Sequence, residues 1–548
     1  MDKTNKAISR RNALGLMSGA GTLAMFPSSA IAQDYKTPGV YTVEQNAFPN
    51  SVVQVPTSIT AFVGHTEKVE YEGQALIGSP TPIRSLNEFH AMFGAGPPTK
   101  FKLVKNEDSG EISLGAEGSK STYDLSSVGT VYGLYDAVRM FFINGGSECV
   151  IASTGSYNDD ITVEGLQSGL TALEKQETAS ILVVPDTARL SEEHASTVNN
   201  AMLAHCGDMQ SRFAILDLVN GDQPLTNDDS DPVTKFRNGI YIDKLAYGAA
   251  YYPWLNTTLH DVSDVTYEAL MPASRKLLAG ALASDIKELL ADKTPLERAA
   301  FVGAISGPQP IADAPPMPHP ASERVVPDEF QPAVIHDALL NLRDYKSLIQ
   351  TMTTRMNIQP PSGAMAGVYA SVDNSRGVWK APANVSAAGI VGPTVSITDQ
   401  AQEDLNVPIN GMAVNAIRSF ISQGTLVWGA RTLDGNSLDW RYISVRRTMI
   451  MLEQSIKTAI RAYIFAPNDA NTWVAIKGMI SSFLTDVWKQ GGLPGAVPED
   501  AFSVHAGLGS TMTSADILDG ILRVTVLVAV TRPAEFIEMT FQQKMQQS

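Results

Sequence analysis

The sequence predicts an α/β (α+β) protein of several domains, and three observations support this prediction. The chain has 548 residues, which is too long for one ordinary hydrophobic core and suggests two to four domains. Hydrophobic residues make up 44% of it and charged residues 18%, as in folded proteins. Strand-like apolar runs alternate with helical segments in the middle third, whereas amphipathic helices and two strand-like runs fill the last quarter.

The charge and the apolar content argue against two classes of function. The net charge of -16 argues against direct nucleic-acid binding, which needs a basic surface. No internal apolar run reaches the roughly 18 residues that span a membrane, so we expect no stable membrane insertion. Cys149 and Cys206 could form one disulfide, but so few cysteines are typical of buried apolar groups in a reducing compartment.

Residues 1–33 have the features of a leader. Arg10 and Arg11 form a twin-arginine pair, an uncharged stretch follows, and the small residues of 30–32 resemble a cleavage site. Because charge, uncharged stretch and cleavage site come in the right order, they predict a twin-arginine export signal. The alternative is an extra flexible arm whose arginines only resemble such a signal.

The next segments predict an extended arm and the first part of a core. Residues 34–55 form the arm, because Pro38 and Gly39 block a helix and the residues after them favour a strand. Residues 56–155 are the N-terminal part of the core, and within them 94–130 is polar and predicts a surface insertion. The other elements expected here are strands at 58–64 and 149–151 and helices at 86–93 and 132–143.

Residues 156–385 are expected to form an α/β middle domain. Apolar runs at 180–186 and 213–217 end in Asp186 and Asp217, with helical segments between and after them. This alternation predicts mostly parallel strands. An aspartate at the end of a strand can be catalytic, but more often it caps the next helix or turn.

Residues 386–548 are expected to form a C-terminal domain of helices and strands. Apolar residues three or four positions apart predict helices at 443–465 and 472–490, and the usual meaning of such stripes is a core. A long β-branched run predicts a strand at 521–530, and a second strand is expected at 536–541. Ten mostly apolar residues at 521–530 suggest burial on both faces of that strand.

Motifs for catalysis are missing from the sequence. It contains no phosphate-binding loop, no G-x-S-x-G elbow and no H-E-x-x-H pair, and its eight histidines are scattered. The members of a Ser-His-Asp triad can lie far apart in sequence, but no nucleophile elbow anchors one here. We therefore expect no catalytic residues, no cofactor and no metal, and a protein that is not an enzyme.

Short segments along the chain resemble the contractile phage tail sheath family. The segments from the last quarter are 415–418, 428–432, 440–447, 453–456, 465–469, 483–484, 488–491 and 533–536. Similar segments occur upstream at 38–41, 141–146, 251–254 and 376–384. The resemblance therefore covers nearly the whole chain after residue 33. The leader is not part of the usual family pattern, and neither is the loop at 505–507.

This resemblance implies a structural role. A sheath subunit polymerises helically around an inner tube and contracts to drive the tube through a target envelope. The implied partners are further copies of the chain, the inner tube protein, and baseplate and terminal cap proteins. The particle would assemble in the cytoplasm as part of a phage tail or phage-tail-like particle, with twin-arginine export as the alternative. Other candidate functions are an exported α/β hydrolase and a static baseplate or cap component.

The resemblance also implies two sets of contact residues. Strands of the arm and of the C-terminus are expected to complete sheets in neighbouring subunits, although they could instead close a sheet within their own subunit. The residues expected in this exchange are Pro38, Gly39, Val40, Tyr41, Val43, Phe536, Ile537, Met539 and Phe541. A tube-facing role is expected for basic residues of the two helices, although a charged helix face is usually only solvated. These residues are Arg446, Arg447, Lys457, Arg461, Lys477 and Lys489.

Overall fold

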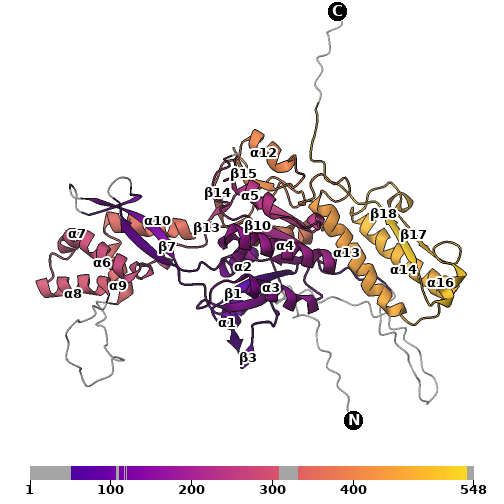
Figure 1. Ribbon diagram of the computed structural model, residues 1–548, viewed down its shortest axis with the longest axis horizontal. Helices are drawn as coiled ribbons and strands as arrows, with labels where there is room; N and C mark the ends of the chain where they lie inside the picture. The colour runs from indigo at the N-terminus through magenta and orange to yellow at the C-terminus, as the bar shows by residue number, and fades with distance from the viewer. Residues whose placement is uncertain are drawn as a thin grey trace, which may run out of the picture. The chain divides into compact units, whose positions relative to one another are not determined.

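The structure, a computed structural model, describes residues 51–106, 110–115, 118, 120–226, 228–307 and 331–539 (Figure 1). The predicted leader and most of the predicted arm lie outside these residues. So do the exchange candidates Phe541, Pro38, Gly39, Val40, Tyr41 and Val43.

The centre of the fold is an eight-stranded sheet with the strand order β16-β15-β11-β10-β9-β1-β8-β4. Its neighbours pair in parallel from β8 to β15, and only the outermost strands β4 and β16 run antiparallel to theirs. The strands are β1 (Thr60–Thr66), β4 (Thr81–Ile83), β8 (Cys149–Ser156), β9 (Ile181–Val183), β10 (Phe213–Asp217), β11 (Gly248–Tyr252), β15 (Asn415–Phe420) and β16 (Gly424–Val427). The prediction of a mostly parallel α/β layer is confirmed.

The expected domain boundaries at 155 and 385 lie within this sheet. Strands β1 and β8 come from the segment before 155, β9 to β11 from the middle segment, and β15 and β16 from the segment after 385. Parallel strands need long crossover connections, so segments distant in sequence combine into one sheet. The three segments therefore share one folded unit.

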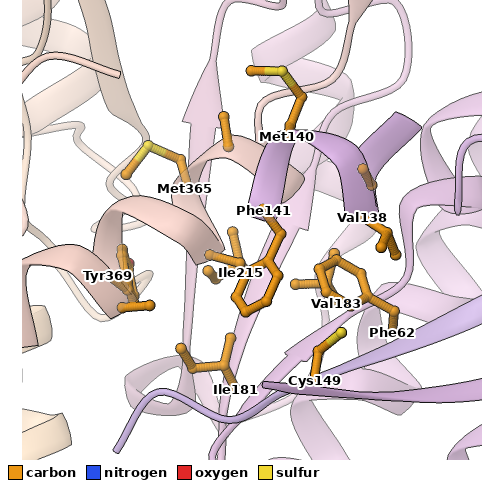
Figure 2. Close-up of a cluster of buried hydrophobic side chains, with 14 of the residues drawn as sticks. Phe62, Val138, Met140, Phe141, Cys149, Ile181, Val183, Ile215, Met365 and Tyr369 are labelled. Atoms are coloured by element: carbon orange, nitrogen blue, oxygen red, sulfur yellow. The ribbon is translucent and has the colours of Figure 1, made fainter. Parts of the chain in front are cut away.

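Helices cover both faces of the sheet. Every residue of its central strands is buried, and most of these residues are apolar, as expected for a sheet covered on both sides. On one face, α2 (Leu134–Ile143) and α11 (Ser362–Arg376) enclose Phe62, Phe141 and Ile181 (Figure 2). The two helices approach closely, because a Cβ atom on Gly363 would lie 2.5 Å from backbone atoms of Ala137. The opposite face packs on α3 (Val163–Ala172) and α4 (Glu192–Met209).

A second core lies in an insertion module, made of residues 100–128 and 262–356. A three-stranded sheet with the order β5-β7-β6 packs on helices through Phe101, Leu125 and Tyr345. The predicted surface insertion at 94–130 is thus one half of a packed module. The elements are β5 (Lys100–Lys105), β6 (Ile112–Leu114), β7 (Ser121–Val128), α6 (Pro272–Ala281), α7 (Ala283–Leu289), α8 (Pro295–Ser306), α9 (Pro332–Leu339) and α10 (Arg343–Met356).

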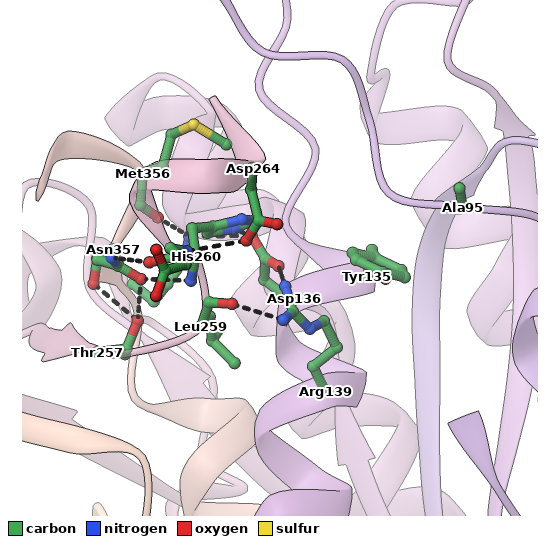
Figure 3. Close-up of polar contacts among 12 residues, drawn as sticks. Ala95, Tyr135, Asp136, Arg139, Thr257, Leu259, His260, Asp264, Met356 and Asn357 are labelled. Carbon is green, nitrogen blue, oxygen red and sulfur yellow. Dashed lines mark hydrogen bonds and ion pairs between the residues drawn. The ribbon is translucent and has the colours of Figure 1, made fainter. Parts of the chain in front are cut away.

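A polar cluster joins the insertion module to the central sheet (Figure 3). Asp136 of α2 accepts a hydrogen bond from Gln359 at 3.1 Å, and its Oδ2 lies 3.0 Å from His260 Nε2. The side chain of Asn357 bonds both backbone groups of His260, at 2.8 and 2.9 Å. Arg139 donates to the carbonyl of Leu259. These side chains bond one another and the neighbouring backbone, so we assign the cluster a structural role.

Residues 443–528 form a C-terminal module with its own core. Helices α13 (Ile443–Ile460) and α14 (Ala470–Lys489) pack with a sheet of two antiparallel strands, β17 (Phe502–Ala506) and β18 (Val524–Val528). Both predicted helices and the strand within 521–530 are confirmed. Two short helices complete the module, α15 (Pro498–Ala501) and α16 (Ser514–Leu518).

The remaining elements connect these parts. They are β2 (Glu70–Tyr71), β3 (Gln74–Ala75), α1 (Leu86–Phe93), α5 (Pro232–Gly239), β12 (Leu255–Thr257), β13 (Ile358–Gln359), β14 (Ile390–Pro393) and α12 (Asp399–Asn406). Short 3-10 helices are η1 (Leu173–Lys175), η2 (Pro185–Arg189), η3 (Leu245–Tyr247), η4 (Val262–Asp264), η5 (Tyr267–Ala269) and η7 (Arg461–Tyr463).

Candidate assembly surface

The two-stranded sheet of the C-terminal module has room for further strands. Among the described residues β17 and β18 pair only with each other, so each strand keeps one edge without a paired neighbour. Val524, Val526 and Val528 pack onto the core of the module, whereas Leu527 points outward and is 59% exposed. The expected burial of this run on both faces is therefore wrong, because only one face is covered. Strand β18 pairs within its own chain, the alternative that the sequence left open.

The chain after β18 ends in an exposed apolar segment, residues 536–539. In the part of the chain that the structure describes, residues 531–539 form no helix or strand, so the strand predicted from Phe536 is not formed within this chain. The exposed fractions are 75% for Phe536, 79% for Ile537 and 73% for Met539. Ile537 and Met539 alternate with Glu538, which is the period of a strand with one apolar face.

Immediately before this segment, Glu535 is held against the central sheet. Arg431 donates two well-aligned hydrogen bonds to its carboxylate, from Nε at 3.0 Å and from Nη2 at 2.7 Å. Asn406 Nδ2 donates at 2.6 Å and the Tyr442 hydroxyl at 3.1 Å. The Arg431 side chain is only 3% exposed. We call these four residues the Glu535 anchor.

The electrostatics of the anchor favour the charged carboxylate. Burial alone would raise the pKa of Glu535, but the hydrogen bonds from Arg431 and Asn406 and the charge of Arg431 outweigh it and lower the pKa below its usual range. The pKa of the Tyr442 hydroxyl is raised, first by burial and then by the neighbouring Glu535 carboxylate. The anchor is thus a charge-assisted contact that is fully formed at neutral pH.

A groove of about 990 Å³ runs beside the anchored chain. Its lining includes Trp428 and Tyr442, acidic residues of α12 such as Glu403, and Ile537 of the exposed segment. The groove therefore borders the point at which the chain leaves the central sheet.

The last residues of the predicted arm lie on the same module. Val52 is buried in its core, and the backbone N–H of Val55 donates to Ser455 Oγ of α13 at 3.0 Å. The described end of the arm therefore contacts α13, and Glu535, just before the exposed segment, contacts Tyr442 at the start of that helix.

Two of the predicted tube-facing residues are inside the protein. Arg446 is 6% exposed and its guanidinium lies 3.9 Å from the ring centre of Tyr247 and 4.5 Å from that of Trp440. Arg447 is 4% exposed and donates to Asp373 at 2.6 and 3.0 Å. The prediction is wrong for both, because Arg446 packs on Tyr247 of η3 and Arg447 binds Asp373 of α11 instead of facing outward.

The other four basic candidates remain at or near the surface. Lys457 is exposed, and Lys477 is half-buried. Arg461 contacts Glu177 at 3.2 Å, and Lys489 lies 3.7 Å from Asp486. Their tube-facing role stays a prediction.

Asp186 and Asp217, at the ends of two strands, cap helices that lie elsewhere in the sequence, not the element that follows each strand. Asp186 accepts from the backbone N–H of Gly133 at 2.6 Å. Asp217 accepts from the backbone N–H of Ser362 at 2.9 Å and from the Ser362 hydroxyl, at the start of α11. Burial raises the pKa of Asp217 to about 7, although the bonds from Ser362 oppose this. Both carboxylates satisfy buried backbone groups, which is the structural role that the sequence favoured.

In the described part of the chain, no group of three or more His, Cys, Asp and Glu side chains could hold a metal ion. Within the same residues, none of the helices is long and apolar enough to cross a membrane.

Comparison with known proteins shows which family the C-terminal module resembles. A model of the phage tail sheath C-terminal domain matches residues 436–544. The tail sheath protein of Burkholderia phage BcepMu is 27% identical over 142 residues, which are 25% of this chain and 28% of the phage protein. The chain thus matches less than a third of the length of this curated relative.

Solved structures are similar over almost the whole chain. The sheath complex of the extracellular contractile injection system PVC, in its contracted state, is 26% identical with a TM-score of 0.55, covering 93% of this chain and 98% of the other. The contracted helical sheath of the anti-feeding prophage is 25% identical with a TM-score of 0.56, covering 93% and 100%. The similarity therefore includes the central sheet and the C-terminal module together.

Proposed function

We propose that this chain, which belongs to the contractile tail sheath family, is a structural sheath subunit that acts by assembly and contraction. The observation that carries the proposal is the C-terminal module. It combines a two-stranded sheet with unpaired edges and an anchored segment whose apolar residues are exposed. Among the described residues of one chain neither feature has a partner, and the two features would complement each other between chains.

In this proposal the exposed segment becomes a strand in the sheet of a neighbouring subunit. Ile537, Met539 and Phe541 would share one face of that strand and pack on the neighbour's helices. An added strand gains backbone hydrogen bonds along its length, so the connection survives large rigid-body motion of the subunits. The arm residues Pro38, Gly39, Val40, Tyr41 and Val43 would add to the sheet in the same way.

Exchange of this kind joins different surfaces of two copies. Such heterologous contacts do not close into a dimer and can continue as a helical polymer. Contraction would then be a rigid-body repacking of subunits between two arrangements. Because the free energy is stored during assembly, the subunit would need no nucleotide chemistry of its own.

The further partners follow from the same role. An inner tube would lie along the polymer axis, with Lys457, Arg461, Lys477 and Lys489 as candidates for contact with it. Baseplate and terminal cap proteins would bind the ends of the polymer. We infer assembly in the cytoplasm as part of a phage tail or tail-like particle, with twin-arginine export as the alternative for residues 1–33.

Negative-stain electron microscopy of the purified chain tests the proposal. Long hollow tubes are the expected result. Closed rings without tubes would identify a static baseplate or cap component instead. A monomer that forms neither tubes nor rings over a range of salt concentrations and pH would contradict an assembly role and return the exported hydrolase to consideration.

A further inference from the structure

The chain between β18 and the exposed segment is tethered at several points. The Thr531 hydroxyl donates to the carbonyl of Gly492 at 3.1 Å, and Arg532 Nη1 donates to that of Leu438 at 2.8 Å. The Thr531 contact is half-buried, and the Arg532 contact is exposed. The Glu535 anchor is the last tether before Phe536, and it is the most buried of the three.

From this geometry we propose that the Glu535 anchor fixes where the connector between subunits begins. The inference rests on the proposed function, because it concerns the same exchanged segment. With the anchor closed, free chain starts at Phe536. With it open, residues 530–535 keep the contacts of Thr531 and of Arg532, which also lies 3.7 Å from Asp439. If those contacts also yield, the connector gains six residues, or about 20 Å of extended chain.

The bonding of the anchor suits it to resist tension. Two nitrogen atoms of Arg431 donate to the Glu535 carboxylate in a planar arrangement. A simple surface ion pair lacks this geometry. The remaining Nη1 of Arg431 donates to the carbonyls of Asn406 and Gly435, so the guanidinium is itself held in place. Opening the anchor would leave a buried arginine without its carboxylate, which is strongly unfavourable.

The length of the connector determines how neighbouring subunits move together. A short connector transmits the displacement of one subunit to the next, whereas a longer connector lets each subunit move independently. Arg431, Asn406 and Tyr442 are therefore positioning residues for the exchanged strand. If the anchor keeps the connector short, the helical lattice should be uniform and contraction should spread along it.

The test compares two variants that carry the same chemical change at two places in the segment. Glu535→Gln keeps the size of the side chain but removes the charge inside the anchor. Glu538→Gln makes the same change three residues later, at an exposed position beyond it. The full chain is used for both, and Tyr442→Phe, which removes one hydrogen bond, provides an intermediate case.

For Glu535→Gln we expect a folded chain in which a nitroxide spin label at the exposed residue 534, attached through Ala534→Cys, moves more freely than in the unmodified chain. Tubes of Glu535→Gln should vary in pitch or contract only in part, whereas Glu538→Gln should match the unmodified chain. Uniform, fully contracting tubes of Glu535→Gln would overturn the inference, and so would an equal defect in Glu538→Gln. Absence of tubes from the unmodified chain would contradict the proposed function instead, while the mobility of the spin label would still test the anchor.

Discussion

At the scale of single residues, the ion pair of Arg447 and Asp373 shows how α13 is attached to α11, a helix that covers the central sheet. Their side chains are 4% and 2% exposed, and Asp373 also accepts from the Thr57 hydroxyl at 2.6 Å. Removing one partner of such a pair leaves a buried charge without compensation.

We therefore expect Arg447→Met to lower the free energy of unfolding by about 3–5 kcal/mol. Lys457→Met, on the exposed side of the same helix, should change it by no more than about 0.5 kcal/mol. Urea unfolding followed by circular dichroism measures both. Equal small effects would mean that Arg447 does not fix the helix.

Phe465 occupies an unfavourable backbone conformation in the turn between α13 and α14. Its φ is 69° and its side chain is fully exposed, so no contact within the chain compensates for the conformation. A bulky residue in the left-handed region costs about 1–2 kcal/mol, and asparagine tolerates that region better. Phe465→Asn should raise the free energy of unfolding by about 0.5–1 kcal/mol.

The control for Phe465→Asn is Val474→Asn, which changes an exposed residue of regular helix α14. It should give no gain. Urea unfolding again provides the measurement, and equal effects of the two variants would show that the conformation of Phe465 is not strained.

The Glu535 anchor should open in acid. Its folded pKa lies below the value of about 4.3 of a free glutamate, so the contact stabilises the chain above that pH and is lost as the pH falls through the lowered pKa. A spin label at residue 534 should therefore become more mobile below about pH 4. In Glu535→Gln the high mobility of the label should not depend on pH.

Asp217 acts in the opposite direction and affects the whole fold. Because its folded pKa is raised to about 7, its contribution to the stability of the chain decreases as the pH rises from about 4 to 7. The mobility of the label at residue 534 must therefore be compared with that of a label in the central strands. Parallel changes in both regions would contradict a local opening of the anchor.

At the scale of elements, the periodicity of apolar residues predicted the helices and strands whose pattern lies within one short segment. The apolar spacing located α13 and α14, and the continuous apolar runs located β9 and β10 as buried parallel strands. The same patterns could not show that Arg446 and Arg447 turn inward, because the partners Tyr247 and Asp373 come from segments distant in sequence. The anchor was missed for the same reason, since 104 residues separate Arg431 from Glu535. The only sequence signal for these two residues was that each lies in a segment that resembles the sheath family.

The two predicted exchange elements can be removed separately. Deleting residues 34–44, or ending the chain after Glu535, should leave a folded monomer that does not polymerise, because each deletion removes one donor strand. Light scattering and electron microscopy measure polymerisation, and circular dichroism reports the fold. Tubes formed by either shortened chain would show that the deleted element is not needed for exchange.

At the scale of the whole molecule, segments far apart in sequence build each part. Strand β15 joins β11 across more than 160 residues, and the strands of residues 100–128 meet helices of 262–356. Such pairings leave no local signal, so the sequence predicted the class of the fold correctly but placed its boundaries inside one sheet. The C-terminal module was predicted better, because its helices and β18 follow one another closely in the chain.

The central claim is that subunits are linked by residues 536–541 added to the β17–β18 sheet of a neighbour. A cryo-EM map of assembled tubes, at a resolution that separates strands, tests it most directly. We expect continuous density from Glu535 of one subunit into the sheet of the next, with Ile537 and Met539 facing the neighbour's helices. Density in which the segment folds back onto its own subunit, with both edges of the β17–β18 sheet still unpaired, would contradict the claim.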